Sequence, residues 1–383
     1  MGSSRGATVA WVGKFCQSPA GSALRLRGRL SGMAQLNSKQ LVLAALQGRP
    51  VPRVPVAPLT VHFCARVGGV SLHRYTSDAA TLADCVIRTG EKFQPDAVFV
   101  SADTWVSAQA MGARVGAVGG DQPWGGLGEP LVRTAADIRR IPPPAPESQG
   151  RYPLMLEALQ RVVAALGHDI AVVACFDQYP FSLAAALMGI NEIMVALDDD
   201  PPLVRALMER CTEYGLAYGR ALAAAGADVL TGGDSPAGLI GPRRYREIAL
   251  PFEQRLIAGL KAATGKPVSL HICGDAEPIL ADMARSGADG LEIDHRTDMG
   301  RACRTVGPDI ALWGNLDPVG VLSRGNPARV REAAGQVRDT VAAAGHRRFV
   351  LSSGCTLAVE TPYANFDAMV AVAHEATGAS RPG

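Results

Sequence analysis

The sequence predicts an α/β protein, a (β/α)8 TIM barrel formed by a single domain with an N-terminal extension. From Asn37 onward, short runs of β-branched residues alternate with longer segments of helical period, the pattern of parallel strands joined by crossover helices. Eight such units can be counted, the number that closes a barrel. A doubly wound open sheet is the alternative. No Gly-x-Gly-x-x-Gly turn follows the first strand and no P-loop occurs, so a nucleotide site has no support.

The opening segment, residues 1–32, differs in composition from the rest of the chain. It is basic and rich in Ser, Gly and Arg, and the first acidic residue of the whole sequence is Asp78. We expect a disordered or targeting-like extension here, with a transit peptide as one form of it. The folded barrel is expected over residues 33–383, with Met33 at its start.

The eight expected strands are short, apolar and bounded by turn residues, which is typical of a sheet covered on both faces. Long helices are expected between them, for example over residues 201–226 and 327–345, because each of these segments begins with Pro and ends with Gly. In chain order the expected strands span residues 54–59, 96–103, 170–177, 227–234, 266–274, 288–294, 309–317 and 348–355.

Composition narrows the class of partner. Charged residues make up 19% of the chain and the net charge is +2, so neither a nucleic acid nor a membrane surface is indicated. No run of eighteen apolar residues occurs, and the eight cysteines are scattered without the spacing of a disulfide scaffold. A cytoplasmic protein with reduced thiols and a small-molecule partner is therefore expected.

Polar residues stand at the carboxyl ends of the expected strands, which in a barrel surround one mouth, where active sites form. Any single Asp or Asn there has a simpler interpretation as a helix cap or turn residue. The set as a whole, with one His and two Cys in it, favours a site. Its members are Asp103, Asp177, Asp234, His271, Cys273, Asp294, Asn315, Asp317 and Cys355.

His271 and Cys273 end the fifth expected strand, and residues two apart on a strand point to the same side. Imidazole and thiolate together suit Zn²⁺, which in catalytic sites takes three protein ligands and keeps one position open. Cys355 ends the last strand and is the best candidate for the third ligand. Sulfur-rich ligation favours transfer of a group to a thiol over hydrolysis, because the metal lowers the pKa of a coordinated thiol.

Five further segments carry a family resemblance: "QLVLAALQGRPVPRVPV", "DAVFVSADTWVSAQAMG", "GGDSPAGLIGPRRYREIALPFEQRL", "GLEIDHRTDM" and "WGNLDPVGVL". With them, the chain from about Met33 resembles the uroporphyrinogen decarboxylase superfamily of (β/α)8 barrels. That superfamily includes porphyrinogen decarboxylases, which use no cofactor, and corrinoid-dependent methyltransferases with a zinc site. His271, Cys273 and Cys355 match the zinc ligands of the methylcobalamin:coenzyme M branch.

The resemblance implies further roles. Zn²⁺ and a corrinoid, supplied as free cobalamin or on a separate corrinoid protein, are the expected cofactors, with a small methyl donor or acceptor as the other partner. Asp294 is preferred over Glu292 as the residue that faces the metal, and Asp103 matches an Asp that contacts pyrrole nitrogens in the decarboxylases; both are expected catalytic residues. Expected contacts of the cofactor are Asn315, Asp317 and Asp234.

Two other functions stay open. Decarboxylation of a porphyrinogen is the first, although the loop "TVHFCARVGGVSLHRY" lacks the Arg pattern of the decarboxylases and the Tyr expected after the third strand falls near Ala186. A non-catalytic barrel that binds a corrinoid protein is the second. The direction of methyl transfer is not fixed by the sequence.

Overall fold

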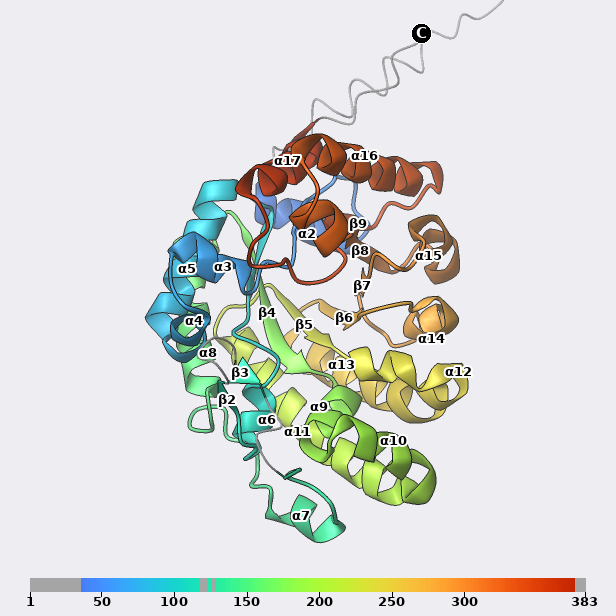
Figure 1. Ribbon diagram of the computed structural model, residues 1–383. Coiled ribbons are helices and arrows are strands. Elements are labelled where there is room, and N and C mark those ends of the chain that lie inside the picture. The colour runs from blue at the N-terminus through green and yellow to red at the C-terminus, as the bar shows by residue number, and fades with distance from the viewer. Residues whose placement is uncertain (1–35, 118–122, 125–128, 376–383) are drawn as a thin grey trace, which may run out of the picture. The chain divides into compact units, whose positions relative to one another are not determined.

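Seven parallel strands form one curled sheet, surrounded by helices in the computed structural model of the chain (Figure 1). The structure describes residues 36–117, 123–124 and 129–375, so the expected extension over residues 1–32 lies outside the described part. Residues Asn37–Gly383 form one compact unit. In sheet order the strands are β1 Ala97–Val100, β4 Ala171–Gln178, β5 Val229–Gly233, β6 Val268–Ile272, β7 Gly290–Ile293, β8 Ala311–Leu316 and β9 Phe349–Ser353.

The first expected strand, residues 54–59, occupies the place between β9 and β1 but forms only an isolated bridge, between Val56 and Leu351. The Ala57 amide donates to the Leu351 carbonyl at 2.9 Å, and the Val56 carbonyl accepts from the Asp96 amide at 2.7 Å. Pro55 and Pro58 have no N–H group, so a continuous ladder cannot form here. The segment nevertheless joins the two edges of the sheet, in keeping with the predicted barrel.

The other seven expected strands all appear, six of them shortened at both ends and β4 shifted along the chain by one residue, and the two long helices begin at the predicted prolines. A separate two-stranded ribbon pairs β2 Gly116–Ala117 with β3 Pro123–Trp124. No single helix in the described ranges is long and apolar enough to cross a membrane, although the bent pair of α9 and α10 passes that test together. The α-helices are α2 Ser38–Leu46, α3 Phe63–Gly68, α4 Leu72–Ser77, α5 Ala79–Phe93, α6 Val106–Ala110, α7 Ala135–Arg140, α8 Tyr152–Leu166, α9 Pro180–Met188, α10 Ile190–Asp199, α11 Pro201–Ala224, α12 Gly241–Arg244, α13 Leu250–Thr264, α14 Leu280–Met283, α15 Met299–Val306, α16 Pro327–Ala343 and α17 Tyr363–His374.

Short helical turns follow several strands on the side of their carboxyl ends. The first, η1, comes directly after β5, and η4 comes directly after β8. Of these turns, η1 lines the cavity inside the sheet, with Ser235 and Pro236. Their bounds are η1 Ser235–Leu239, η2 Tyr245–Ala249, η3 Glu277–Ile279 and η4 Pro318–Ser323.

The inside of the sheet is filled by apolar side chains toward the amino ends of the strands. Phe99 and Trp313 pack edge to face at a ring distance of 5.6 Å, and the Trp313 indole N–H donates to the Ala57 carbonyl. Leu46 and Val42 of α2 belong to the same buried cluster. Because this end is packed shut, a cavity inside the sheet lies toward the carboxyl ends, where the predicted site residues stand.

Candidate metal centre

The end of β6 positions His271 and Cys273. The strand is buried between β5 and β7, and Gly274 follows Cys273 with φ of +88°, a conformation that glycine adopts at little cost. The Cys273 amide donates to the Ser235 hydroxyl at 3.2 Å, and the Gly274 amide donates to the Asp294 carboxylate at 2.9 Å. Both contacts fix the conformation of the turn, so the Cys273 thiol lies on the same side of the strand as the His271 imidazole.

Cys355 reaches the same place from the end of β9. Gly354 precedes it, and a Cβ atom at that position would lie 2.4 Å from the backbone nitrogen of His295, far too close for any other residue without a shift. The Gly354 amide donates to the Leu316 carbonyl at 2.7 Å. This close approach of the β9 end to the turn after β7 brings a thiol that lies 82 residues away in sequence against Cys273.

Three possible ligand atoms converge, all within 4.8 Å of one another: a ring nitrogen of His271 and the two sulfurs. The His271 Nε2 to Cys273 Sγ distance is 2.9 Å, and the Cys273 Sγ to Cys355 Sγ distance is 3.3 Å. Around a tetrahedral zinc such atoms lie roughly 3.6 to 3.8 Å apart, given the usual bond lengths. The donor set therefore fits Zn²⁺ after only a small spreading of the three side chains.

The protonation of the cluster also suits a cation. Burial lowers the pKa of His271, but the hydrogen bond and charge of Cys355, with further carboxylate charges, outweigh it and bring the pKa to about 9. The hydrogen bond between the two thiols lowers the pKa of Cys273 and raises that of Cys355 to about 12. A metal ion would take the place of the protons that these groups share.

Glu292 is the carboxylate that faces the imidazole. Its Oε2 lies 3.8 Å from Nδ1 of His271, which has no hydrogen-bond partner, and its Oε1 accepts from the hydroxyls of Thr231 at 2.5 Å and Ser269 at 2.6 Å. The Glu292 side chain is 3% exposed and lies beside the ring. In metal sites a carboxylate in this place fixes the orientation and tautomer of a ligating His.

The expectation that Asp294 rather than Glu292 faces the metal differs from the structure. β7 ends at Ile293, so the chain has already turned at Asp294. Its carboxylate accepts from the amides of Gly274 and Arg296, both at 2.9 Å, and contacts the His295 ring. Asp294 thereby ties the turn after β7 to the turn after β6, and its part in catalysis stays a prediction.

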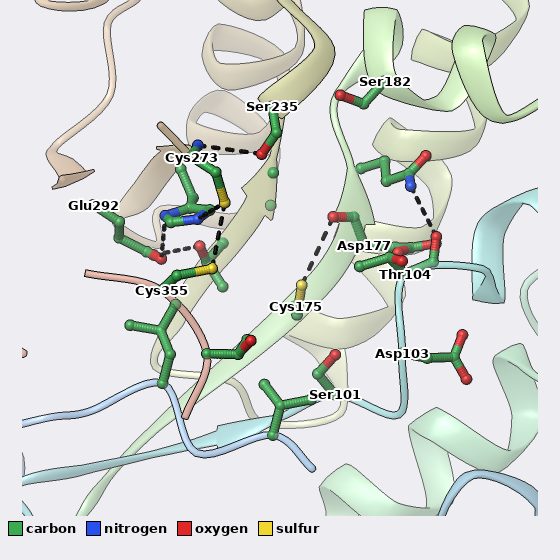
Figure 2. Close-up of a pocket in the computed structure, with 18 of the residues that line it drawn as sticks. Ser101, Asp103, Thr104, Cys175, Asp177, Ser182, Ser235, Cys273, Glu292 and Cys355 are labelled. Carbon is green, nitrogen blue, oxygen red and sulfur yellow. Dashed lines mark hydrogen bonds and ion pairs between the residues drawn. The ribbon is translucent and has the colours of Figure 1, made fainter. Parts of the chain in front are cut away.

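A cavity of about 370 Å³ opens beside the cluster (Figure 2). Cys273, Cys355 and Glu292 lie on one side of it in that view, and Asp103 and Thr104 lie on the other. Asp103 lines this cavity, as predicted, but it is already paired: the Arg151 guanidinium contacts both of its carboxylate oxygens, one of them at 2.9 Å. The pair holds the loop after β1 against the start of α8.

Asp177 also lines the cavity and has an unusual backbone, with φ of +81°. One carboxylate oxygen accepts from the Ser107 amide at 2.8 Å, and the other is buried without a partner. Burial raises the pKa of Asp177 to about 7. Such strained, half-satisfied residues concentrate at functional sites, so Asp177 is a stronger candidate than its strand-end position alone implied.

The residues predicted to contact the cofactor are not gathered at this cavity. Asp234 is fully buried and accepts from the Ser182 amide and hydroxyl, both at 2.7 Å. Asn315 donates to the carbonyls of Asp294 and Thr297, while Asp317 caps η4. Asn315 and Asp317 line a second depression of about 320 Å³ instead. Their assignment as corrinoid contacts stays a prediction.

The seven cysteines within the described residues are all unpaired, so no disulfide competes for the sulfurs of the cluster. Sequence reasoning ranked Glu292 below Asp294 and missed Ser235, Thr231 and Ser269 altogether. The signal that could have found Glu292 is register: it stands beside His271 across the β6 and β7 ladder.

Comparison with known proteins gives four findings. The protein-family profile described as "Uroporphyrinogen decarboxylase (URO-D)" matches residues 37–376. The chain is 29% identical to the methylcobamide:CoM methyltransferase MtbA of Methanosarcina acetivorans, over 88% of this chain and 98% of that protein. It is also 29% identical to the uroporphyrinogen decarboxylase of Alkalilimnicola ehrlichii, over 90% of this chain and 95% of that protein. A solved methyltransferase from Methanosarcina mazei shares the fold with a TM-score of 0.80 at 26% identity, covering 89% of this chain and 99% of that one.

Proposed function

Because the chain belongs to the uroporphyrinogen decarboxylase family and gathers one imidazole and two thiols at its cavity, we propose that it is a zinc-dependent methyltransferase. It moves a methyl group between a corrinoid, free or carried by a separate protein, and a small thiol or other methyl donor or acceptor. The single observation that carries the proposal is the convergence of His271, Cys273 and Cys355. The similarity to MtbA and to the Methanosarcina mazei methyltransferase supports it.

His271, Cys273 and Cys355 would hold the zinc, and the side facing the cavity would stay open. A bound Zn²⁺ would supply Lewis acidity that keeps the sulfur of an incoming thiol deprotonated near neutral pH. Two thiolates and a neutral imidazole cancel the charge of the ion, which leaves such a sulfur nucleophilic. The alternative chemistry, hydrolysis, more often uses His and carboxylate ligands.

The chain's own side chains complete the site. Glu292 lies on the Nδ1 side of the His271 ring, and Nε2 faces the sulfur of Cys273. Ser235 holds the turn that carries Cys273. The apolar walls of the cavity, among them Leu59 and Phe99, keep water from the reacting sulfur.

When the thiol is the methyl acceptor, the atoms and electrons of the reaction balance without a further reactant. The thiol gives up its proton, its sulfur lone pair forms the new bond to the methyl carbon, and the electron pair of the broken carbon–cobalt bond stays on the corrinoid. The reverse direction uses the same ligands. Neither direction is fixed by the geometry.

Porphyrinogen decarboxylation is the second candidate, since decarboxylases stand among the relatives. Its substrate carries many carboxylates, yet no Lys or Arg is among the described residues that line the cavity. The cluster of two thiols also has no use in a reaction without a metal. Both observations favour methyl transfer.

The metal assignment is tested by zinc content. Purified wild type should hold one zinc per chain, and Cys273→Ala and Cys355→Ala should lose it, as measured by plasma mass spectrometry. Cys303→Ala is the matched control, because Cys303 is a buried cysteine of α15, outside the cluster. A full zinc content in both Cys273→Ala and Cys355→Ala would contradict the assignment of this cluster as the zinc site.

The reaction is tested with methylcobalamin. The absorbance change of the corrinoid on loss of its methyl group should be fast with wild type and a small thiol, and should stop in Cys273→Ala. Release of carbon dioxide from a porphyrinogen by zinc-free protein, with no loss of methyl from the corrinoid, would replace this function by the second candidate.

A further inference from the structure

We propose that the small methyl donor or acceptor of this site is an uncharged or cationic molecule and not an anion. The inference rests on the proposed function and adds the charge class of the substrate. It follows from the charges of the side chains that line the cavity.

No Lys or Arg is among the described residues that line the cavity. An anionic head group is normally recognised by a guanidinium, an ammonium or a row of free amides. The polar side chains that do line the cavity carry carboxyl groups, hydroxyls, a carboxamide, thiols and two imidazoles.

His62 is the one imidazole that lines the cavity apart from the metal ligand. Its Nε2 lies 2.8 Å from the Ala102 carbonyl, so that nitrogen carries a proton and is engaged. Burial lowers the pKa of His62, which leaves it neutral near pH 7. It therefore supplies no positive charge for a substrate.

Arg151 contacts Asp103, which lines the cavity on the side away from the cluster. It is committed: besides the two contacts to Asp103, it donates to Gln109 at 2.6 Å and to the Thr76 carbonyl at 3.2 Å. The arginine side chain is 13% exposed. The Asp103–Arg151 pair contributes no net charge to the cavity.

Carboxyl groups line the cavity where a cation would be needed to bind an anion. Glu292, beside the cluster, is buried with hydroxyl partners, and no arginine or lysine among the described residues contacts it. Asp177, on the other wall, adds negative charge when it ionises. An anionic substrate would meet repulsion in a low-dielectric space, whereas a cationic one would be attracted.

The test uses three thiols that share a two-carbon chain: 2-aminoethanethiol, 2-mercaptoethanol and 2-mercaptoethanesulfonate. Zinc-loaded wild type and methylcobalamin are mixed with each, and kcat/KM is divided by the uncatalysed rate of the same thiol. Binding of each thiol is measured separately by calorimetry. We expect the cationic and neutral thiols to exceed the sulfonate at least tenfold in both measurements.

A sulfonate that equals or exceeds the other two thiols in binding and in kcat/KM would overturn the inference. If thiols bind in the expected order but none removes the methyl group, the proposed function fails while the charge class stands. Absence of binding by all three thiols would count against both.

Charge reversal at the rim gives an independent check. Thr104 is exposed and lines the cavity opposite the cluster, so Thr104→Lys adds a cation without disturbing a buried contact. The variant should raise the ratio of sulfonate to neutral thiol several-fold, while the uncharged Thr104→Gln should not. An unchanged ratio in Thr104→Lys would mean that charge at this cavity does not select the substrate.

Discussion

Glu292 and Asp294 are both acidic and two residues apart, yet the structure gives them different tasks. Glu292 faces the Nδ1 atom of His271, whereas Asp294 binds backbone amides. We expect Glu292→Gln to lower zinc affinity about tenfold or more, as loss of such a ring-orienting carboxylate does in other sites. Competition with a chromophoric chelator measures it.

Asp294→Asn is the matched control, because it removes one charge at the same strand end and should change zinc affinity less than Glu292→Gln. Equal losses in the two variants would mean that net charge, and not the orientation of the His271 ring, is what Glu292 supplies.

Asp177 should make stability depend on pH. Its pKa is raised in the folded state, to about 7, so the folded chain binds the proton more tightly than the unfolded chain. This stabilising contribution is complete below the unfolded pKa, near 4, and is lost as pH rises toward 7, by at most about 1.4 kcal/mol per pH unit. The free energy of unfolding of Asp177→Asn, measured with urea, should therefore increase relative to that of wild type as pH rises from 4.5 to 7.5.

The control for that series is Asp367→Asn, a carboxylate on the exposed face of α17. The difference in the free energy of unfolding between wild type and this variant should not change over the same pH range. A flat difference for Asp177→Asn as well would show that its carboxylate is ionised throughout.

Individual residues also show which parts of the site can be predicted from sequence. His271 and Cys273 are predictable because they stand two apart at the end of one expected strand, and Cys355 because it ends another. The Asp103–Arg151 pair was not predictable, since the two residues lie in separate loops and no local pattern links them. The different roles of Glu292 and Asp294 depend on where β7 stops, which composition does not fix.

At the scale of elements, the segment over residues 54–59 shows how pairing depends on single residues. Its short apolar run predicts a strand, but its prolines reduce the ladder to one bridge. Side chains replace the missing backbone bonds: the Asp96 carboxylate accepts from both Arg53 guanidinium nitrogens at 2.6 Å and from the Val56 amide at 2.8 Å.

Asp96→Ala should therefore be costly. The aspartate is fully buried, and its loss leaves the Arg53 charge and the Val56 amide without a partner. We expect a loss of about 3 kcal/mol in the free energy of unfolding, measured by urea denaturation. Asp309→Ala breaks an exposed contact with Arg348 and should cost less than about 1 kcal/mol. Equal costs would contradict the view that this pair secures the closing segment.

At the scale of the whole folded unit, the metal ligands come from β6 and β9, strands separated in sheet order by β7 and β8. An ion bound by both strands stabilises only the folded state. Adding zinc to metal-free wild type should raise Tm by several degrees, measured by calorimetry. Cys355→Ala should show little change, and Mg²⁺ should give none. An equal zinc effect in Cys355→Ala would place the stabilising ion elsewhere.

The fold was predictable at this scale because seven of eight apolar runs became strands of one sheet with helices outside. The cavity was not, because its walls combine side chains from most of the strands and its volume depends on their packing. The charge balance of that cavity, on which the substrate class depends, is a property of the whole fold.

X-ray absorption at the zinc edge of the purified wild-type protein tests the central claim most directly. Coordination by His271, Cys273 and Cys355 predicts two sulfur ligands at about 2.3 Å, with the remaining ligands nitrogen or oxygen, and a change in the spectrum when a thiol is added. Cys355→Ser should show one sulfur. A shell without sulfur, or one that no thiol alters, would contradict the proposed open zinc site.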